Sequence, residues 1–182
     1  VAPFNLQEEY DNSGLLVGEL DTPLQGTLVC MDITEAVVAE AVARGCNLVV
    51  SHHPLIFQGL KRLCGDTERS RAIILALREH VGLLAAHTNL DAAYGGINYA
   101  IAQKVGLTQL QVLAPTLLGK EGTGIGLVGT LDTVLCEEDF LMYIAQIFPQ
   151  QPCLRYSPKT GKTIERVALC GGSGIEFLDQ AI

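Results

Sequence analysis

The chain has 182 residues, of which 48% are hydrophobic and 18% are charged, and its formal net charge is −8 at pH 7. This length suits one large domain or two small ones, and the low charged fraction favours strands that are buried on both faces. The acidic balance argues against a large nucleic-acid footprint, and the longest apolar runs are far shorter than the roughly 20 residues that a membrane span requires.

Strands and helices alternate through the first half of the chain. The predicted elements, in order, are a strand at 27–33, a helix at 34–44, a strand at 47–51, a helix at 67–81 and a strand at 82–86. Thr34 has the side chain of a helix N-cap, and Gly45 is typical of a helix end. The short strands are apolar on most positions, which is typical of parallel strands in an α/β protein.

The alternation continues in the second half, after a change of composition at Pro115 and the glycines at 119, 122, 124 and 126. A helix is predicted at 95–105, before this change, and the elements predicted after it are a strand at 126–131, a helix at 137–148, a strand at 166–170 and a helix after the glycines at 171–174. We therefore predict an α/β fold with mainly parallel or mixed sheets and right-handed crossovers. The composition change predicts two α/β units, 1–114 and 115–182.

Three of the four histidines follow two successive predicted strands directly. His52 and His53 stand before Pro54, which ends the strand, and His87 follows the next strand with Asp91 close behind. Ligands of parallel sheets collect beyond the carboxyl ends of strands, so these side chains are candidates for one site. Imidazoles with an aspartate suit zinc, iron or manganese. A hydrogen-bonded polar cluster without metal explains the same spacing equally well.

Other features admit plainer explanations. His80 is interpreted as a cation in the last turn of a helix, where the helix dipole favours it. The glycines of 171–174 could cradle a phosphate, but the full P-loop pattern is lacking, and a simple strand-to-helix connection is favoured. The six cysteines form no C-x-x-C pair and are expected to be mostly buried thiols in a reducing compartment. No secretory signal is visible, so we predict a cytoplasmic protein.

Four motifs together resemble the Nif-three-like (YbgI-like) family. They are DNSGLLVG at 11–18, SHHPLIF at 51–57, HTNLD at 87–91 and GGSG at 171–174, and they match in order and approximate spacing. Members of this family are regarded as metal-dependent hydrolases and are also named type-two GTP cyclohydrolase homologues. The resemblance implies the Nif-three-like fold and a ring-like homohexamer.

The resemblance also implies roles for individual residues. It assigns His52, His53 and Asp91 as ligands of two divalent metal ions, with Asp91 also catalytic. It places His87 beside the ions, where it would relay a proton, and it suggests that Asp11 and Asn12 order the cavity. The family has a late G-H-x-x-x-E motif that also binds metal, whereas no histidine follows His87 in this sequence. We therefore expect a member that is incomplete at its C-terminus.

These features together predict a dinuclear metal-dependent hydrolase that acts on a small molecule, with a nucleotide-like substrate suggested by the family names. In such a site one ion would activate water while the other polarises the bond under attack. The alternative is a non-catalytic metal carrier or a protein-interaction scaffold. A purely structural oligomer subunit also fits the high apolar content.

Overall fold

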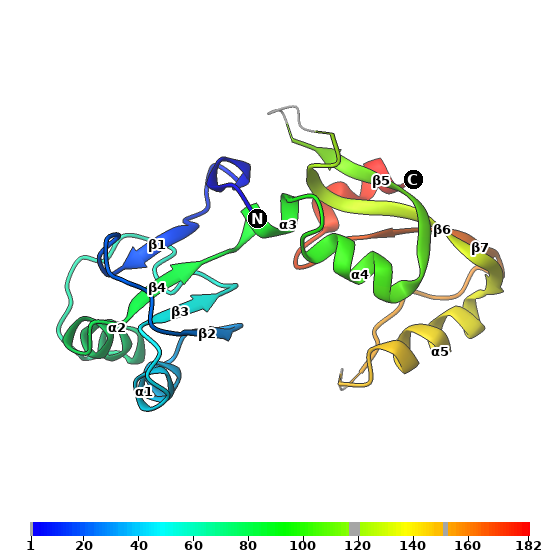
Figure 1. The fold of residues 1–182 in the computed structure, drawn as a ribbon. Coiled ribbons are helices and arrows are strands. Elements are labelled where there is room, and N and C mark those ends of the chain that lie inside the picture. The colour runs from blue at the N-terminus through cyan, green and yellow to red at the C-terminus, as the bar shows by residue number, and fades with distance from the viewer. Residues whose placement is uncertain (1, 117–120, 151–152) are drawn as a thin grey trace. The chain divides into compact units, whose positions relative to one another are not determined.

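The computed structural model describes residues 2–116, 121–150 and 153–182, so that Gly119 lies outside the described residues. Contacts divide the chain into two compact units, Val1–Leu90 and Asp91–Ile182, and Figure 1 traces both. The composition change at 114/115 does not coincide with this division. Strand β5 (Leu107–Pro115) ends there but pairs with β6 (Gly124–Cys136), and this pairing joins the residues on both sides into one sheet.

The first unit is built on a four-stranded mixed sheet with the order β1-β4-β3-β2. Its strands are β1 (Gly14–Val17), β2 (Thr27–Cys30), β3 (Leu48–Ser51) and β4 (Gly82–Ala85). Strands β2, β3 and β4 are parallel, as predicted, whereas β1 pairs with β4 in the antiparallel direction. The three parallel strands therefore end at one edge of the sheet, and β1 begins at that same edge.

Two helices cover one face of this sheet, α1 (Glu35–Ala43) and α2 (Glu68–Arg78), as Figure 1 shows. The Thr34 side chain accepts a hydrogen bond from a backbone N–H of α1, so the predicted cap is confirmed. The buried core between helices and sheet consists of apolar side chains from all these elements, including Val38, Ala41, Val49, Ile73 and Leu83. This packing holds the strand ends in place.

His80 was predicted to lie in the last turn of α2. The structure places it two residues past the end of that helix. Its backbone φ is 55°, a left-handed conformation, and the Val81 N–H donates to the carbonyl of Ala76 at 2.8 Å. This is the hydrogen-bond pattern of a Schellman helix end, in which the left-handed position usually belongs to glycine.

The second unit contains an antiparallel three-stranded sheet with the order β5-β6-β7. Its elements are α3 (Thr88–Ala92, which begins in the first unit), α4 (Ile97–Val105), β5, β6, α5 (Glu137–Ile147), β7 (Thr163–Leu169) and α6 (Leu178–Ala181). Two 3₁₀ turns complete the list of helical elements, η1 (Phe4–Leu6) in the first unit and η2 (Ile175–Phe177) in the second. The α/β class and the mixed sheet are confirmed. The prediction of mainly parallel pairing is wrong for this sheet, because β5 was not recognised and antiparallel neighbours need no helical crossover.

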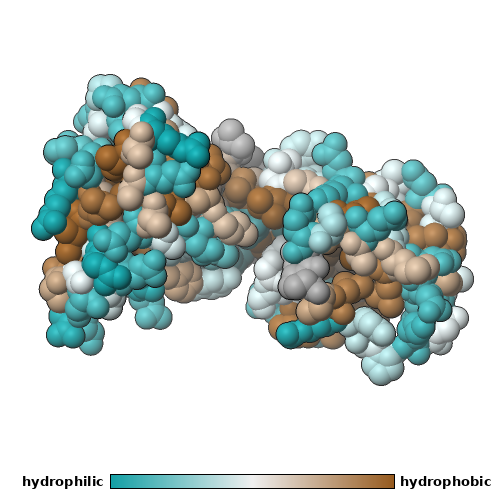
Figure 2. Space-filling view, turned by 90° about the horizontal axis from the view of Figure 1, so that it is seen from below, coloured by the Kyte–Doolittle hydropathy of each residue, from teal (hydrophilic) through white to brown (hydrophobic). Residues whose placement is uncertain are grey.

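Apolar side chains reach the surface of both units (Figure 2). Val29 on β2 is 77% exposed and Met142 on α5 is 61% exposed. All six cysteines are free; three are half-buried and three are exposed, so the expectation of mostly buried thiols is wrong. Among the described residues, no helix combines the length and the apolar character needed to cross a bilayer.

Candidate metal centre

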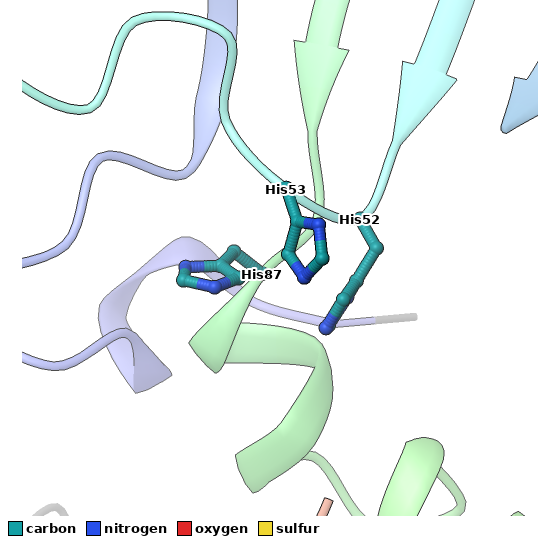
Figure 3. Close-up of side chains that lie close together, drawn as sticks. All are labelled: His52, His53 and His87. Carbon is teal, nitrogen blue, oxygen red and sulfur yellow. The ribbon is translucent and has the colours of Figure 1, made fainter. Parts of the chain in front are cut away.

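The three histidines that follow the strands meet at the carboxyl edge of the first sheet. Strand β3 ends at Ser51 and leads directly into His52 and His53, and β4 ends at Ala85, two residues before His87. Because β3 and β4 are adjacent and parallel, both loops begin at the same edge. Figure 3 shows the three imidazole rings facing one another there.

A hydrogen-bonded turn allows two successive histidines to serve one site. Neighbouring residues of a regular strand point to opposite faces, so the backbone must bend after β3. The buried Ser51 hydroxyl donates to the carbonyl of His53 at 2.8 Å. The N–H of His53 donates to the carbonyl of Met31 at 3.0 Å, which anchors the turn to the end of β2.

The imidazoles are close enough to share a cation. Their ligand nitrogens all lie within 4.8 Å of one another. The ring centroids are 5.0 Å apart for His52 and His53, 5.2 Å for His52 and His87, and 5.8 Å for His53 and His87. His52 and His87 are half-buried, whereas His53 is exposed, so the cluster opens to solvent on one side.

Each imidazole has its Nδ1 bound to an oxygen atom. The partners are the Ala86 carbonyl for His52 at 2.9 Å, the Asp32 carboxylate for His53 at 2.7 Å, and the Asp11 carboxylate for His87 at 2.8 Å. A carbonyl or an ionised carboxylate can only accept, so each Nδ1 carries the hydrogen. The lone pair of each neutral ring is therefore on Nε2.

Asp11 reaches His87 because β1 is antiparallel to β4. The register pairs Gly14 with Ala85, so the residues just before β1 lie beside those just after β4. Burial raises the pKa of the Asp11 carboxyl, but hydrogen bonds from the Thr88 side chain, from His87 and from two backbone N–H groups outweigh it and lower the pKa to about 2. The carboxylate is therefore ionised at neutral pH.

Two aromatic side chains flank the cluster. The Phe57 ring meets the His87 ring edge-on, with centroids 6.3 Å apart, and the Tyr10 ring lies 6.4 Å from Phe57. Asn12 donates to the carbonyl of Ile56 at 2.6 Å and so ties the DNSG segment to the loop that carries Phe57. Tyr10 is 64% exposed and Phe57 is 41% exposed, so part of each side chain lies at the surface.

Asp91 follows His87 by four residues on helix α3 and belongs to the second unit. Its backbone carbonyl accepts a hydrogen bond from the buried Asn98 side chain at 3.0 Å. The cluster of ligand atoms found in the described residues consists of the three imidazoles. The assignment of Asp91 as a ligand therefore stays a prediction.

The glycine-rich segment at 171–174 has a structural role within the second unit. The Gly171 N–H donates to the side-chain oxygen of Asn98 at 2.7 Å. The helical elements that follow, η2 and α6, are only three and four residues long. These contacts support a simple strand-to-helix connection at 171–174 and not a phosphate-binding loop.

The histidines at the carboxyl edge of the sheet have the ligand chemistry that divalent zinc, iron and manganese prefer. Metal-binding histidines almost always donate their other ring N–H to a carboxylate or a backbone carbonyl, and all three imidazoles do so here. Neutral nitrogens are the ligands that zinc, iron and manganese sites use with carboxylates. The donor set therefore fits the cation that the sequence motifs imply.

Sequence reasoning missed three residues of this site, Asp32, Phe57 and Tyr10. Asp32 follows β2 at the same edge as the histidines, so the rule about the carboxyl ends of strands was a sufficient signal for it. Phe57 carried no such signal, because its contact with His87 depends on the path of a loop.

Comparisons with known proteins agree over the whole chain. The family model described as Duf34/NIF3 (NGG1p interacting factor 3) matches residues 1–182. A GTP cyclohydrolase 1 type 2 homolog of Clostridium acetobutylicum is 31% identical over 180 residues, covering 99% of this chain and 67% of the relative. The homolog of Clostridium perfringens is 32% identical over 181 residues, covering 100% of this chain and 68% of the relative.

A solved structure supports the same similarity. The Staphylococcus aureus hypothetical protein SA1388 superposes with a TM-score of 0.88 at 28% identity, covering 98% of this chain and 70% of that protein. The chain thus spans about two thirds of the length of the curated relatives and of this structure.

Proposed function

The chain belongs to the Duf34/NIF3 family, and we propose that it binds divalent metal at the turn of His52 and His53 and hydrolyses a small molecule there. One observation carries the proposal: three imidazoles converge, and each has its Nδ1 bound to an oxygen atom. This arrangement orients the Nε2 lone pairs as metal-binding histidines require.

The proposed protein ligands are His52, His53 and Asp91, as the family resemblance implies. Two divalent ions, of zinc, iron or manganese, would share them, with further ligands completing each coordination shell. Bound there, the ions would supply Lewis acidity that lowers the pKa of water and polarises the bond under attack. Asp91 follows His87 by four residues, on helix α3.

His87 is the proposed acid–base group, with Asp91 as the second catalytic residue. Its imidazole is paired with the ionised Asp11 carboxylate, which stabilises the imidazolium that forms when Nε2 takes up a proton. The ring is 20% exposed, so a proton can pass between it and solvent. General acid–base catalysis of this kind is typically worth about 10²–10⁴-fold in rate.

The proposed substrate is a small molecule with a flat ring, such as a nucleotide. Phe57 and Tyr10 offer exposed aromatic surface next to His87, on which a planar base could stack. The names of the relatives, GTP cyclohydrolase 1 type 2 homologs, point to the same class of substrate. The net charge of −8 gives no support to a nucleic-acid ligand.

We further propose a cytoplasmic homo-oligomer, a hexamer by family resemblance. Large exposed apolar side chains such as Leu20, Val29 and Met142 would be covered by contacts between copies of the chain. Light scattering of the purified chain measures this directly, and a monomer at micromolar concentration would contradict it.

The first experiment is metal analysis of the parent chain and of His52→Ala and His53→Ala. His80→Ala is the matched control, because His80 lies outside the cluster. We expect bound metal in the parent and the control and a clear loss in the two cluster variants. Equal metal content in all four proteins would overturn the proposed site.

The second experiment is turnover of the metal-loaded protein on GTP, phosphodiesters and amides. Hydrolysis that is lost on chelation supports the enzyme. Complete inactivity on all three classes, in protein that holds metal, would instead favour a metal carrier or an interaction scaffold. The Phe57→Ala variant then tests the substrate class, since losing a stacking surface should raise KM more than it lowers kcat.

A further inference from the structure

The Asp11 carboxylate accepts five hydrogen bonds at the site, and one of them comes from the ring of His87. Its side chain is fully buried, at 0% exposure, beside a His87 side chain that is 20% exposed. We propose that Asp11 is a positioning residue that holds His87 in the Nδ1–H tautomer with Nε2 turned toward the other two imidazoles. The role of the oriented His87 in proton transfer rests on the proposed function, whereas the orientation itself does not.

Five hydrogen bonds fix the carboxylate from two segments of the chain. Oδ1 accepts from the His87 ring at 2.8 Å and from the Asn12 N–H at 2.7 Å. Oδ2 accepts from the Thr88 N–H at 3.1 Å, from the Ser13 hydroxyl at 3.0 Å and from the Thr88 hydroxyl. Asn12 and Ser13 stand just before β1, and His87 and Thr88 follow β4, so the pairing of β1 with β4 holds both sets of donors against the carboxylate.

A carboxylate in this position determines which nitrogen carries the hydrogen. It has no hydrogen of its own, so Nδ1 of His87 must donate to it. The remaining nitrogen, Nε2, is then an acceptor on the side of the ring toward the other two imidazoles (Figure 3). An imidazole in the opposite tautomer would present an N–H to the centre of the cluster and could neither accept a proton nor meet a cation there.

Asp32 provides a contrast within the same cluster. It makes a bond of similar length to Nδ1 of His53, at 2.7 Å, but its side chain is 67% exposed and that of His53 is 49% exposed. Water can replace an exposed acceptor, whereas it reaches a fully buried one with difficulty. The positioning effect should therefore be strong for Asp11 and weak for Asp32.

Asp11→Asn is the informative substitution because it keeps the shape and removes the obligatory acceptor. Three donors surround Oδ2 and two surround Oδ1, so the amide oxygen should take the Oδ2 place and the NH₂ group the Oδ1 place. The NH₂ group then donates to Nδ1 of His87, and the hydrogen of the ring moves to Nε2. The change resembles the wrong tautomer that results when the aspartate of a Ser-His-Asp triad becomes asparagine.

The test is two-bond ¹⁵N–¹H correlation spectroscopy of the full chain labelled on histidine, without metal. Only four histidines contribute, and His87→Ala assigns the signal of interest. We expect His87 of the parent to be the Nδ1–H tautomer, His87 of Asp11→Asn to be predominantly the Nε2–H tautomer, and His87 of Asp32→Asn to be unchanged. An Nε2–H tautomer in the parent would overturn the proposal without any variant.

An unchanged His87 tautomer in folded Asp11→Asn would overturn it as well. Metal content separates this inference from the proposed function: a parent that binds no metal contradicts the metal centre, yet the tautomer result stands by itself. Where turnover is found, Asp11→Asn should lower kcat by on the order of 10²-fold with little change in KM. An equal effect of Asp32→Asn on kcat would contradict the special role of Asp11.

Discussion

The two units of this chain differ in the role of their most distinctive residues, which are histidines in the first unit and glycines in the second. In the first unit all four histidines are present, and three of them meet where parallel strands end. The second unit has no histidine, and its unusual positions are glycines in a tightly paired antiparallel sheet. In the first unit the special side chains are oriented by hydrogen bonds toward a shared centre, whereas in the second the absence of a side chain allows strands to approach.

This difference shows which kind of change each unit should resist. A unit organised around a ligand tolerates loss of a ligating side chain, because the fold does not depend on it. A unit organised around close backbone packing does not tolerate an added methyl group. Four expected effects test this comparison, in order of decreasing size.

The largest expected effect is that of Gly124→Ala in the second unit. A Cβ at this position would lie 2.2 Å from the carbonyl oxygen of Ala114, and the backbone φ is +152°. We expect a loss of about 3 kcal/mol or more in the free energy of unfolding, measured by urea denaturation.

Gly161→Ala is the matched control for Gly124→Ala. Gly161 also has a positive φ, of +77°, but nothing lies within 4 Å of its added Cβ. It should cost only the conformational strain of about 1–2 kcal/mol. Equal losses in both variants would show that strand contact does not limit position 124.

The second effect is stabilisation of the first unit by metal. Zinc at a hundred times its Kd should raise the free energy of unfolding of the parent by about 2.7 kcal/mol, and EDTA should reverse this. His53→Ala should lose most of the gain while keeping the stability of the metal-free parent. Thermal unfolding with and without zinc measures both quantities. A metal-induced shift of the same size in His53→Ala would break the comparison.

The third effect is one that both units should share. His80 in the first unit and Gln109 in the second have left-handed backbone angles, with φ of 55° and 50°. Glycine relieves this strain but loses more conformational entropy on folding, so His80→Gly and Gln109→Gly should each gain about 0.5 kcal/mol. Urea midpoints test this, and a loss at only one position would indicate side-chain contacts that matter there.

The smallest effect is the pH dependence of Glu137 in the second unit. Hydrogen bonds from the backbone N–H groups of Thr160 and Gly161 lower the pKa of its carboxyl below the ordinary value of 4.5. The ionised form is therefore favoured in the folded state, and its contribution is present above pH 4.5 and lost as the pH falls below it. The difference in urea midpoint between the parent and Glu137→Gln should shrink over that range. A constant difference would contradict this account.

Much of the first unit could be predicted from local patterns. The strand before His52, the cap at Thr34 and the helix end at Gly45 all depend on residues a few positions apart, and all three were found. Strand β1 was missed although it is as long as β2, β3 and β4, and β5 was missed because its register shift breaks the alternation. Helix α3 is a short helix inside the HTNLD motif, and it was not predicted.

The sequence by itself determined the chemistry that is available: which donors exist, that they follow strand ends, and to which family the motifs point. Only the tertiary structure decided how these donors are arranged. Asp11 and His87 are 76 residues apart and meet because β1 pairs with β4 in one register, and Asp32 reaches His53 across adjacent strands. Helices and caps are encoded by neighbours along the chain, whereas strand pairing is decided by the packing of the whole unit, and a single sequence does not display that pairing.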